Sequence, residues 1–324
     1  MALTPKENFL RAFRRAGPEW VPYAGEGVVV EVIPHEWDVP RLDEVGAEAR
    51  DAWGVVWRQA DPRVLPYVKE SPLKTVADMR RYEMPDPTRE DLLDGPKAVI
   101  AKLADRADHL LWGVIPPGPF TRACTLVGME NLLGLMLTDP DEVSAFIGRI
   151  VDTEVVLARR LIELGLDIGG VSDDYGTTQA LLMSPAAWRA IIKPHLARTY
   201  AVFKDAGCLM KQHSCGNVTE IIPDLIEIGL DILNPLQAGA LDHAAIKARF
   251  GDRLMLWGGV DVRVLMAGTP ADVVEEVKRR LRILAPGGGY VCAHDQALPW
   301  PEANWAAYLD AVRRYGRYPI TIGA

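Results

Sequence analysis

Two pairs of histidine and cysteine, each with one residue between the partners, are the residues in this sequence best suited to chemistry. The first pair is His213 and Cys215, and the second is Cys292 and His294. Side chains two positions apart on a strand point the same way, so each pair can present two ligands to one ion. Imidazole and thiolate suit zinc. The two pairs predict a zinc site. The alternative is that each cysteine is a buried apolar residue and each histidine a hydrogen-bonded loop residue.

Two adjacent carboxylates form a second candidate group. Asp173 and Asp174 follow an apolar run that ends in Gly-Gly-Val-Ser at 169–172. Like charges in proximity raise one pKa, as a general base requires, and carboxylates also bind metals. We therefore predict that Asp173 and Asp174 act in catalysis, on a metal or on substrate. The competing interpretation is that one caps a helix and the other is exposed to solvent.

The elements that would position these residues alternate regularly from about residue 106 onward. Short apolar runs alternate with longer amphipathic segments, and glycines or Ser/Thr/Asp-Pro pairs mark many of the helix ends. Strands are expected at 110–115, 166–172, 208–212, 230–233, 254–257 and 289–293, and helices at 139–165, 184–207, 218–228, 241–250, 269–284 and from 301 onward. This order predicts an α/β protein with a parallel sheet, and its length favours a closed (β/α)8 TIM barrel over an open sheet.

A barrel of this kind has its active site at the carboxyl ends of the strands. Asp173, Asp174, His213 and Cys215 fall at such ends, as do Cys292 and His294. Three further residues in these places, Asn234, Gln237 and Trp257, are expected to bind substrate. No G-x-G-x-x-G motif opens a predicted helix, which argues against a dinucleotide site.

The first 105 residues are less regular, and we expect them to cover one end of the barrel within a single domain of residues 1–324. A helix is predicted at 3–15 and a strand at 28–33, whereas the proline-rich stretch 62–96 indicates surface loops and short helices. Tryptophans in and near this region could line an aromatic or corrin pocket, although core packing is the simpler role. These are Trp20, Trp37, Trp53, Trp57 and Trp112.

Composition sets the broad class of the protein. Of 324 residues, 49% are hydrophobic and 25% charged, which is typical of a globular protein. A net charge of −8 without a basic cluster argues against nucleic-acid binding. The sequence shows neither a signal-peptide pattern nor an apolar run of about 20 residues, so we expect a cytoplasmic protein without a membrane span. Its four cysteines are then expected to be thiols.

The stretch 207–237 resembles the uroporphyrinogen-decarboxylase-like superfamily. It contains His-Ser-Cys-Gly-Asn at 213–217, Ile-Ile-Pro-Asp-Leu at 221–225 and Asp-Ile-Leu-Asn-Pro-Leu-Gln at 231–237. The resemblance covers nearly the whole chain and implies a TIM barrel. Decarboxylases of the superfamily carry an arginine-rich segment near the N-terminus that grips substrate carboxylates. The corresponding segment here reads Tyr-Ala-Gly-Glu-Gly at 23–27, without arginine.

The other branch of the superfamily comprises cobalamin-dependent methyltransferases whose zinc is held by H-x-C and a later cysteine. The resemblance implies that His213 and Cys215 are ligands and offers Cys292 as the third. His294, seven positions before the Pro-Glu-Ala-Asn element that starts at Pro301, is the alternative. The sequence does not decide whether Cys292 or His294 is the third ligand.

The resemblance implies a zinc-dependent methyltransferase that moves a methyl group between a corrinoid and a thiol or methoxylated small molecule. No histidine lies in a D-x-H-x-x-G motif, so the corrinoid is expected free or on a separate corrinoid protein. A homodimer is a further expectation of the resemblance. Two alternatives remain: a decarboxylase-like tetrapyrrole enzyme without metal, and a non-catalytic corrinoid-binding protein.

Overall fold

A parallel sheet of seven strands forms the centre of the molecule. The computed structural model describes residues 3–34, 37, 39–296 and 298–323. The strands lie in the order β1-β5-β6-β7-β8-β9-β10, and each pairs in parallel with its neighbours. Their bounds are β1 Val29–Val32, β5 Leu110–Ile115, β6 Ile168–Ser172, β7 Leu209–His213, β8 Ile232–Asn234, β9 Met255–Val260 and β10 Tyr290–His294. The predicted α/β class and parallel sheet are confirmed.

The chain segment that precedes β1 contacts the β10 edge of this curled sheet. Tyr23 forms a parallel bridge with Cys292. The Ala24 amide donates to the Cys292 carbonyl at 2.9 Å, and the Cys292 amide donates to the Pro22 carbonyl at 2.8 Å. The described residues therefore give a curled, barrel-like sheet of seven strands, consistent with the predicted TIM barrel, and the closed eight-stranded form stays a prediction. A single bridge at Tyr23 lies beside β10.

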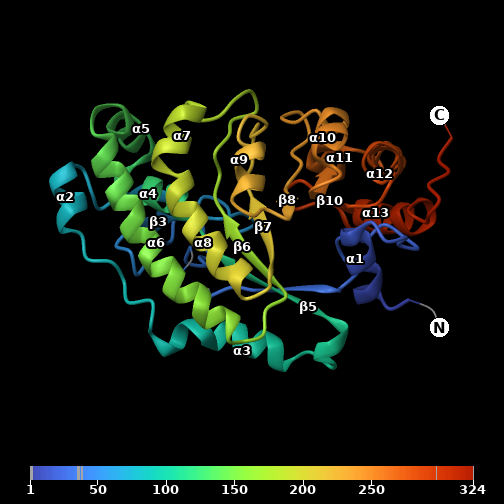
Figure 1. Ribbon diagram of the computed structural model, residues 1–324, viewed down its shortest axis with the longest axis horizontal. Helices are drawn as coiled ribbons and strands as arrows, with labels where there is room; N and C mark the ends of the chain where they lie inside the picture. The colour runs from blue at the N-terminus through green and yellow to red at the C-terminus, as the bar shows by residue number, and fades with distance from the viewer. Residues whose placement is uncertain (1–2, 35–36, 38, 297, 324) are drawn as a thin grey trace.

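Helices lie along the outer side of the sheet, where α6, α8 and α12 pack against it (Figure 1). The helices that follow β5 and β6 are α4 Pro119–Val127, α5 Met129–Thr138, α6 Pro140–Ile162, α7 Pro185–Ile191 and α8 Lys193–Asp205. Those that follow β7, β8, β9 and β10 are α9 Ile222–Glu227, α10 His243–Phe250, α11 Val262–Ala267, α12 Pro270–Leu284 and α13 Glu302–Tyr315.

Two of the predicted helices differ in detail from the structure. The helix expected over 184–207 is two helices, since Pro194 has no amide to donate to a preceding carbonyl and α8 starts afresh beside it. Asp139, the expected N-cap of α6, makes no capping hydrogen bond. Thr269, in contrast, caps α12 reciprocally with Asp272 in a capping box.

Helix α1 (Pro5–Arg14) packs against the starts of the strands. Phe9 and Ala12 lie in an apolar cluster whose other members include the first or second residue of every strand of the sheet: Val29, Leu110, Ile168, Leu209, Ile232, Met255 and Val291. Arg15 donates to the carbonyls of Gly251 at 2.9 Å and Leu254 at 2.6 Å, which holds the end of α1 beside β9. Helix α1 thus closes the amino end of the sheet. That the whole segment 1–105 covers one end stays a prediction.

A second, antiparallel sheet lies within the first hundred residues and was not predicted. It consists of β2 Glu48–Arg50, β3 Val56–Arg58 and β4 Tyr67–Glu70, and the short helices α2 Val76–Arg81, η2 Glu90–Leu93, α3 Asp94–Ala101 and η3 Arg106–Asp108 follow it. Trp37, Trp53 and Trp57 are buried in the main core, so they pack the interior and do not line a pocket. The guanidinium of Arg122 on α4 stacks 4.4 Å from the Trp53 ring, which ties the small sheet to the barrel.

Among the residues that the structure describes, no helix has the length and apolar character needed to cross a bilayer.

Candidate metal centre

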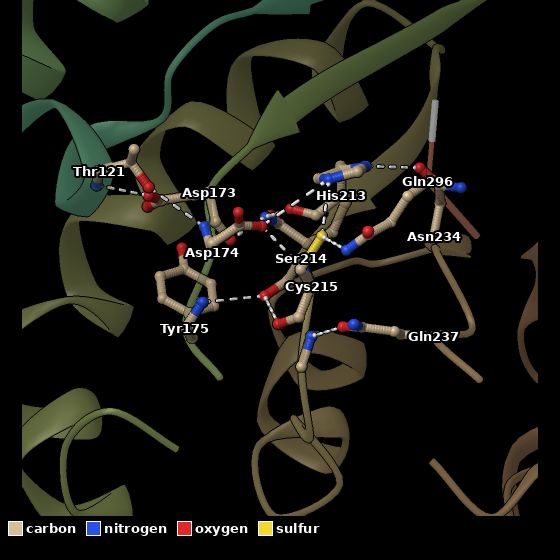
Figure 2. Close-up of polar contacts among 12 residues, drawn as sticks. Thr121, Asp173, Asp174, Tyr175, His213, Ser214, Cys215, Asn234, Gln237 and Gln296 are labelled. Atoms are coloured by element: carbon tan, nitrogen blue, oxygen red, sulfur yellow. Dashed lines mark hydrogen bonds and ion pairs between the residues drawn. The ribbon is translucent and has the colours of Figure 1, made fainter. Parts of the chain in front are cut away.

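The candidate site lies where three neighbouring strands end. Ser172 of β6 pairs with His213 of β7, and His213 pairs with Asn234 of β8. The residues that follow these strand ends are therefore side by side, although they lie far apart along the chain. Figure 2 shows Asp174, His213 and Cys215 converging at this edge of the sheet, with Asn234 and Gln296 around them.

Three side chains from two strand ends form one possible ligand group. One ligand atom each from Asp174, His213 and Cys215 lies within 4.8 Å of the others. The His213 Nε2 atom is 3.5 Å from Cys215 Sγ and 3.7 Å from Asp174 Oδ1. Among the described residues, this is the one cluster of three or more such side chains.

The two separations measured from His213 Nε2 suit ligands of one zinc ion. Zinc binds nitrogen at about 2.0–2.1 Å and sulfur at about 2.3 Å with tetrahedral angles, so two ligand atoms lie about 3.5 Å apart. Both measured separations are close to that value. Imidazole, thiolate and carboxylate are all zinc ligands, and a set of three leaves a fourth position for water or substrate, as in catalytic zinc sites. The residues present therefore fit the ion.

Asn234 sets the orientation of the His213 ring. His213 Nδ1 lies 2.9 Å from Asn234 Oδ1, and the Asn234 amide nitrogen donates to the Trp257 carbonyl at 3.3 Å. That second bond fixes which atom of the amide faces the imidazole, so Nδ1 carries the proton and the Nε2 lone pair faces Cys215. Such partners behind a ligating histidine fix its tautomer and raise its basicity. Asn234, predicted to bind substrate, lies behind the histidine in this structure.

Replacing Asn234 with Ala should therefore weaken metal binding while leaving all three ligands in place. The expected loss of zinc affinity is about 10–100-fold, the usual effect of removing a partner behind a metal ligand. Competition with a chromophoric chelator measures this loss. Asn131→Ala is the control, because Asn131 donates to the carbonyls of Lys74 and Val127 and lies outside the ligand group. Equal zinc affinity in Asn234→Ala and wild type would contradict the orienting role.

The loop that presents Cys215 is held by backbone contacts to its neighbours. The Cys215 amide donates to Asp174 Oδ1 at 2.7 Å, and the Gly216 amide donates to Gln237 Oε1 at 2.6 Å. Gly216 has φ of 83°, and a Cβ there would lie 2.3 Å from the Gly176 backbone, so the close approach of the two loops requires glycine. Gln237, also predicted to bind substrate, positions this loop.

Burial, and next the nearby Asp174 carboxylate, raise the pKa of the Cys215 thiol to about 12. Without a cation the thiol is therefore protonated at neutral pH. A divalent ion reverses this preference because it stabilises the thiolate that binds it. The Gln296 side-chain amide donates to Cys215 Sγ at 3.9 Å. Gln296 was not predicted, because it lies in a loop after β10 and belongs to no recognisable sequence motif.

The two adjacent carboxylates occupy different environments. Asp174 is half exposed and belongs to the ligand group. Asp173 is 1% exposed and accepts hydrogen bonds from the amides of Phe120 at 3.0 Å and Thr121 at 2.6 Å, at the start of α4. Complete burial raises the pKa of Asp173 to about 6, although hydrogen bonds from Thr121 and Phe120 oppose the shift. The geometry thus gives Asp173 a helix-capping contact and Asp174 a place at the metal centre.

The raised pKa of Asp173 should make the stability of the protein depend on pH. Because this pKa is about 6 in the folded state and about 3.9 in the unfolded chain, the folded state holds a proton that the unfolded chain releases between these values. The stabilising contribution is complete below about pH 4 and is lost as the pH rises through 6, a change of about 3 kcal/mol. Urea unfolding of wild type and Asp173→Asn at pH 4.5, 5.5 and 7 measures it. Parallel profiles for the two proteins would refute the assignment.

Cys292 and His294 do not join the ligand group in the described structure. Cys292 is fully buried, and burial raises its pKa to about 12. Its carbonyl accepts from the Tyr308 hydroxyl of α13 at 2.8 Å, and that helix lies outside the sheet. His294 packs against Trp300 at a centroid distance of 4.8 Å, and its Nδ1 is buried without a hydrogen bond. The structure thus brings Asp174, and neither member of the second Cys/His pair, to His213 and Cys215.

Trp257, the third residue predicted to bind substrate, faces the inside of the barrel. It contacts Phe9 edge-on at a centroid distance of 6.0 Å and lies 6.3 Å from Trp112. Lys211 lies between these two tryptophans. Sequence reasoning did not select Lys211, because a single lysine in a strand is more often exposed than buried.

Comparison with known proteins agrees with this fold. A uroporphyrinogen decarboxylase from Nocardia farcinica is 27% identical over 240 residues, 70% of this chain and 65% of that protein. A methylated-thiol–coenzyme M methyltransferase from Methanosarcina mazei is 26% identical over 220 residues, 66% of this chain and 56% of that protein. The chain thus spans less than two thirds of the length of either relative.

A solved structure gives the same fold over nearly the whole chain. It is described as a methyltransferase from Methanosarcina mazei, with a TM-score of 0.73 and 20% identity, and it covers 97% of this chain and 99% of that one. The family model for uroporphyrinogen decarboxylase (URO-D) matches residues 51–315, which is most of the sequence. The resemblance seen in the sequence is thereby confirmed, and the chain belongs to the URO-D family.

Proposed function

We propose that this chain is a methyltransferase that moves a methyl group between a corrinoid and a thiol or methoxylated small molecule. The supporting observation is the ligand group of Asp174, His213 and Cys215, whose separations suit a zinc ion. The methyltransferase relatives from Methanosarcina mazei add support from sequence and fold. Decarboxylases match at similar identity, so it is the site, more than the relatives, that favours methyl transfer.

His213, Cys215 and Asp174 would hold the ion, and Asn234 would orient His213. When bound, zinc supplies Lewis acidity that lowers the pKa of a substrate thiol or polarises a methyl ether. The protein residues keep the imidazole tautomer fixed through Asn234 and the Cys215 loop fixed through Gln237. With three protein ligands, one position stays open for the sulfur or oxygen atom of the substrate.

The corrinoid is expected to come from outside this sequence, free or on a separate corrinoid protein. None of the six histidines lies in a D-x-H-x-x-G motif, and one barrel with its amino-terminal segment occupies the chain that the structure describes. The purified protein should therefore lack corrin absorbance. A corrinoid that co-purifies at one per chain would contradict this part of the proposal.

The decisive experiment follows the state of the cobalt. The zinc-loaded chain is mixed with methylcobalamin and a panel of thiols, and in a second series with reduced cobalamin and methoxylated compounds. Methyl transfer changes the cobalt spectrum, and the change should require both His213 and Cys215. Porphyrinogen consumption without any cobalt change would instead favour the decarboxylase alternative. If neither methyl transfer nor porphyrinogen consumption occurs, the result favours a non-catalytic corrinoid-binding protein.

A further inference from the structure

Asp174 is the member of the ligand group that lies outside the H-x-C motif, in the loop that follows β6. Its side chain is half exposed, so its own packing does not fix its place. The residue before it is fixed, because the Asp173 amide donates to the His213 carbonyl at 2.9 Å. A ligand keeps its distance from an ion only if surrounding contacts hold it there. The contacts that hold the backbone of Asp174 are therefore part of the centre.

Two hydroxyl groups hold this backbone from two different elements. The Asp174 amide donates to Thr121 Oγ1 on α4 at 3.2 Å. The next amide along the chain, that of Tyr175, donates to Ser214 Oγ at 3.0 Å. Two successive amides of one loop thus bind two hydroxyls, one on each side (Figure 2). We call Thr121 and Ser214 the hydroxyl clamp.

Both sides of the hydroxyl clamp are anchored in the interior. Thr121 is followed on α4 by Arg122, which is 1% exposed and lies 3.7 Å from a carboxylate oxygen of Asp51. Ser214 is completely buried, and its amide donates to the Asn234 carbonyl at 2.7 Å. A shift of the loop between the two hydroxyls would therefore disturb buried contacts on both sides.

The start of α4 is packed directly against the end of β6. The Gly118 amide donates to the Ser172 carbonyl at 2.5 Å. A Cβ on Gly118 would lie 2.6 Å from the Cβ of Asp173, so the close approach of the helix to this loop requires glycine. Helix α4 therefore holds its Thr121 hydroxyl at a fixed place beside the Asp174 amide.

We infer that Thr121 is a positioning residue of the metal centre, although it offers no ligand atom. Its hydroxyl fixes the backbone of Asp174 and so keeps the carboxylate beside His213 Nε2, at the 3.7 Å separation that suits two ligands of one ion. A carboxylate held in this way completes a set of three protein ligands, as catalytic zinc sites require. This inference rests on the metal centre that supports the proposed function, and it adds a residue of α4 to that centre.

Zinc affinity, measured by competition with a chromophoric chelator, tests the inference without any methyl transfer. Thr121→Val keeps the shape of the side chain and removes the acceptor, whereas Thr121→Ser keeps the acceptor. Thr125→Val is the matched control, because the Thr125 hydroxyl lies one turn later on α4 and donates to the Arg122 carbonyl at 2.8 Å. Asp174→Asn, alone and combined with Thr121→Val, completes a double-mutant cycle. Melting temperatures are recorded for every variant.

Thr121→Val should bind zinc about three- to tenfold more weakly than wild type, the effect of losing one hydrogen bond. Thr121→Ser and Thr125→Val should bind zinc like wild type. In the Asp174→Asn background the Thr121→Val change should have no further effect, because Thr121 acts through Asp174. General damage to the fold would instead weaken binding equally in both backgrounds. Should Thr121→Val not fold, Thr121→Ala takes its place.

Wild-type zinc affinity in Thr121→Val overturns the inference, and so does an equal loss of affinity in the Asp174→Asn background. If zinc is nevertheless lost in Cys215→Ser, the clamp is refuted and the metal centre stands. Because the assay contains neither corrinoid nor substrate, failure of the methyl-transfer experiment leaves this result independent.

Discussion

Replacing Cys215 with Ser should remove nearly all zinc from the protein. The Cys215 sulfur lies 3.5 Å from His213 Nε2, at the separation of two ligands on one zinc ion. A serine hydroxyl at this place is a far poorer ligand than a thiolate, since it does not ionise near neutral pH. Loss of a partner behind a ligand already costs about 10–100-fold in affinity, so loss of the thiolate should exceed about 100-fold. Elemental analysis after dialysis against a weak chelator gives the metal content.

Cys208→Ser is the matched control for this variant. Cys208 is a buried thiol whose Sγ donates to the Leu166 carbonyl at 3.4 Å, away from the ligand group. Its replacement should keep zinc at one per chain and leave methyl transfer unchanged. Zinc at full occupancy in the Cys215 variant would exclude the proposed centre and with it the main support for methyl transfer.

The strands that carry the site could be predicted closely from the sequence. Strand β5 has the predicted bounds, and β7 and β10 end within one residue of the predicted positions. Parallel strands covered on both faces appear as short continuous apolar runs, and glycines separate these runs from the helices. The rule that active sites lie at carboxyl strand ends then brought Asp174, His213 and Cys215 together from distant parts of the sequence.

The continuous apolar runs that identify the strands do not show which side chains point into the barrel. Tyr290, Val291, Cys292 and Ala293 on β10 are all buried, so neither face of the strand is marked as interior by its polarity. The structure shows Val291 in the cluster inside the barrel, and Cys292 as its neighbour points to the other side. A matching two-residue spacing at a second strand end was therefore not sufficient to predict a second pair of ligands.

The small antiparallel sheet and the bridge at Tyr23 could not be predicted from the sequence, for a different reason. Strands of three residues, such as β2 and β3, are too short for an alternation of polar and apolar residues to be recognised. The bridge at Tyr23 depends on how the sheet closes on itself, which is a property of the whole barrel. Lys211 was overlooked because only the assembled interior shows the two tryptophans that surround it.

The third metal ligand can be identified by three single variants measured side by side. In Asp174→Asn the affinity for zinc should fall about tenfold or more. The amide keeps the shape of the side chain but is neutral and a weaker ligand than the carboxylate. Cys292→Ala should keep zinc, since Cys292 is fully buried and lies outside the ligand group. His294→Ala should keep zinc as well, because the ring packs on Trp300 and lies outside the group that Asp174 completes.

The contrast between Asp174 and His294 is the sharpest part of this experiment, because both residues follow strand ends at the same edge of the sheet. His294 has a buried Nδ1 without a hydrogen bond, so a rotation of the ring could offer a nitrogen to the ion in place of Asp174. Loss of zinc in His294→Ala together with full zinc in Asp174→Asn would assign the third position to His294. Because Asp174 also accepts from the Cys215 amide, its variant should be checked for an unchanged melting temperature. With folding intact, a fall in zinc affinity confined to Asp174→Asn would establish a His-Cys-Asp centre in this chain.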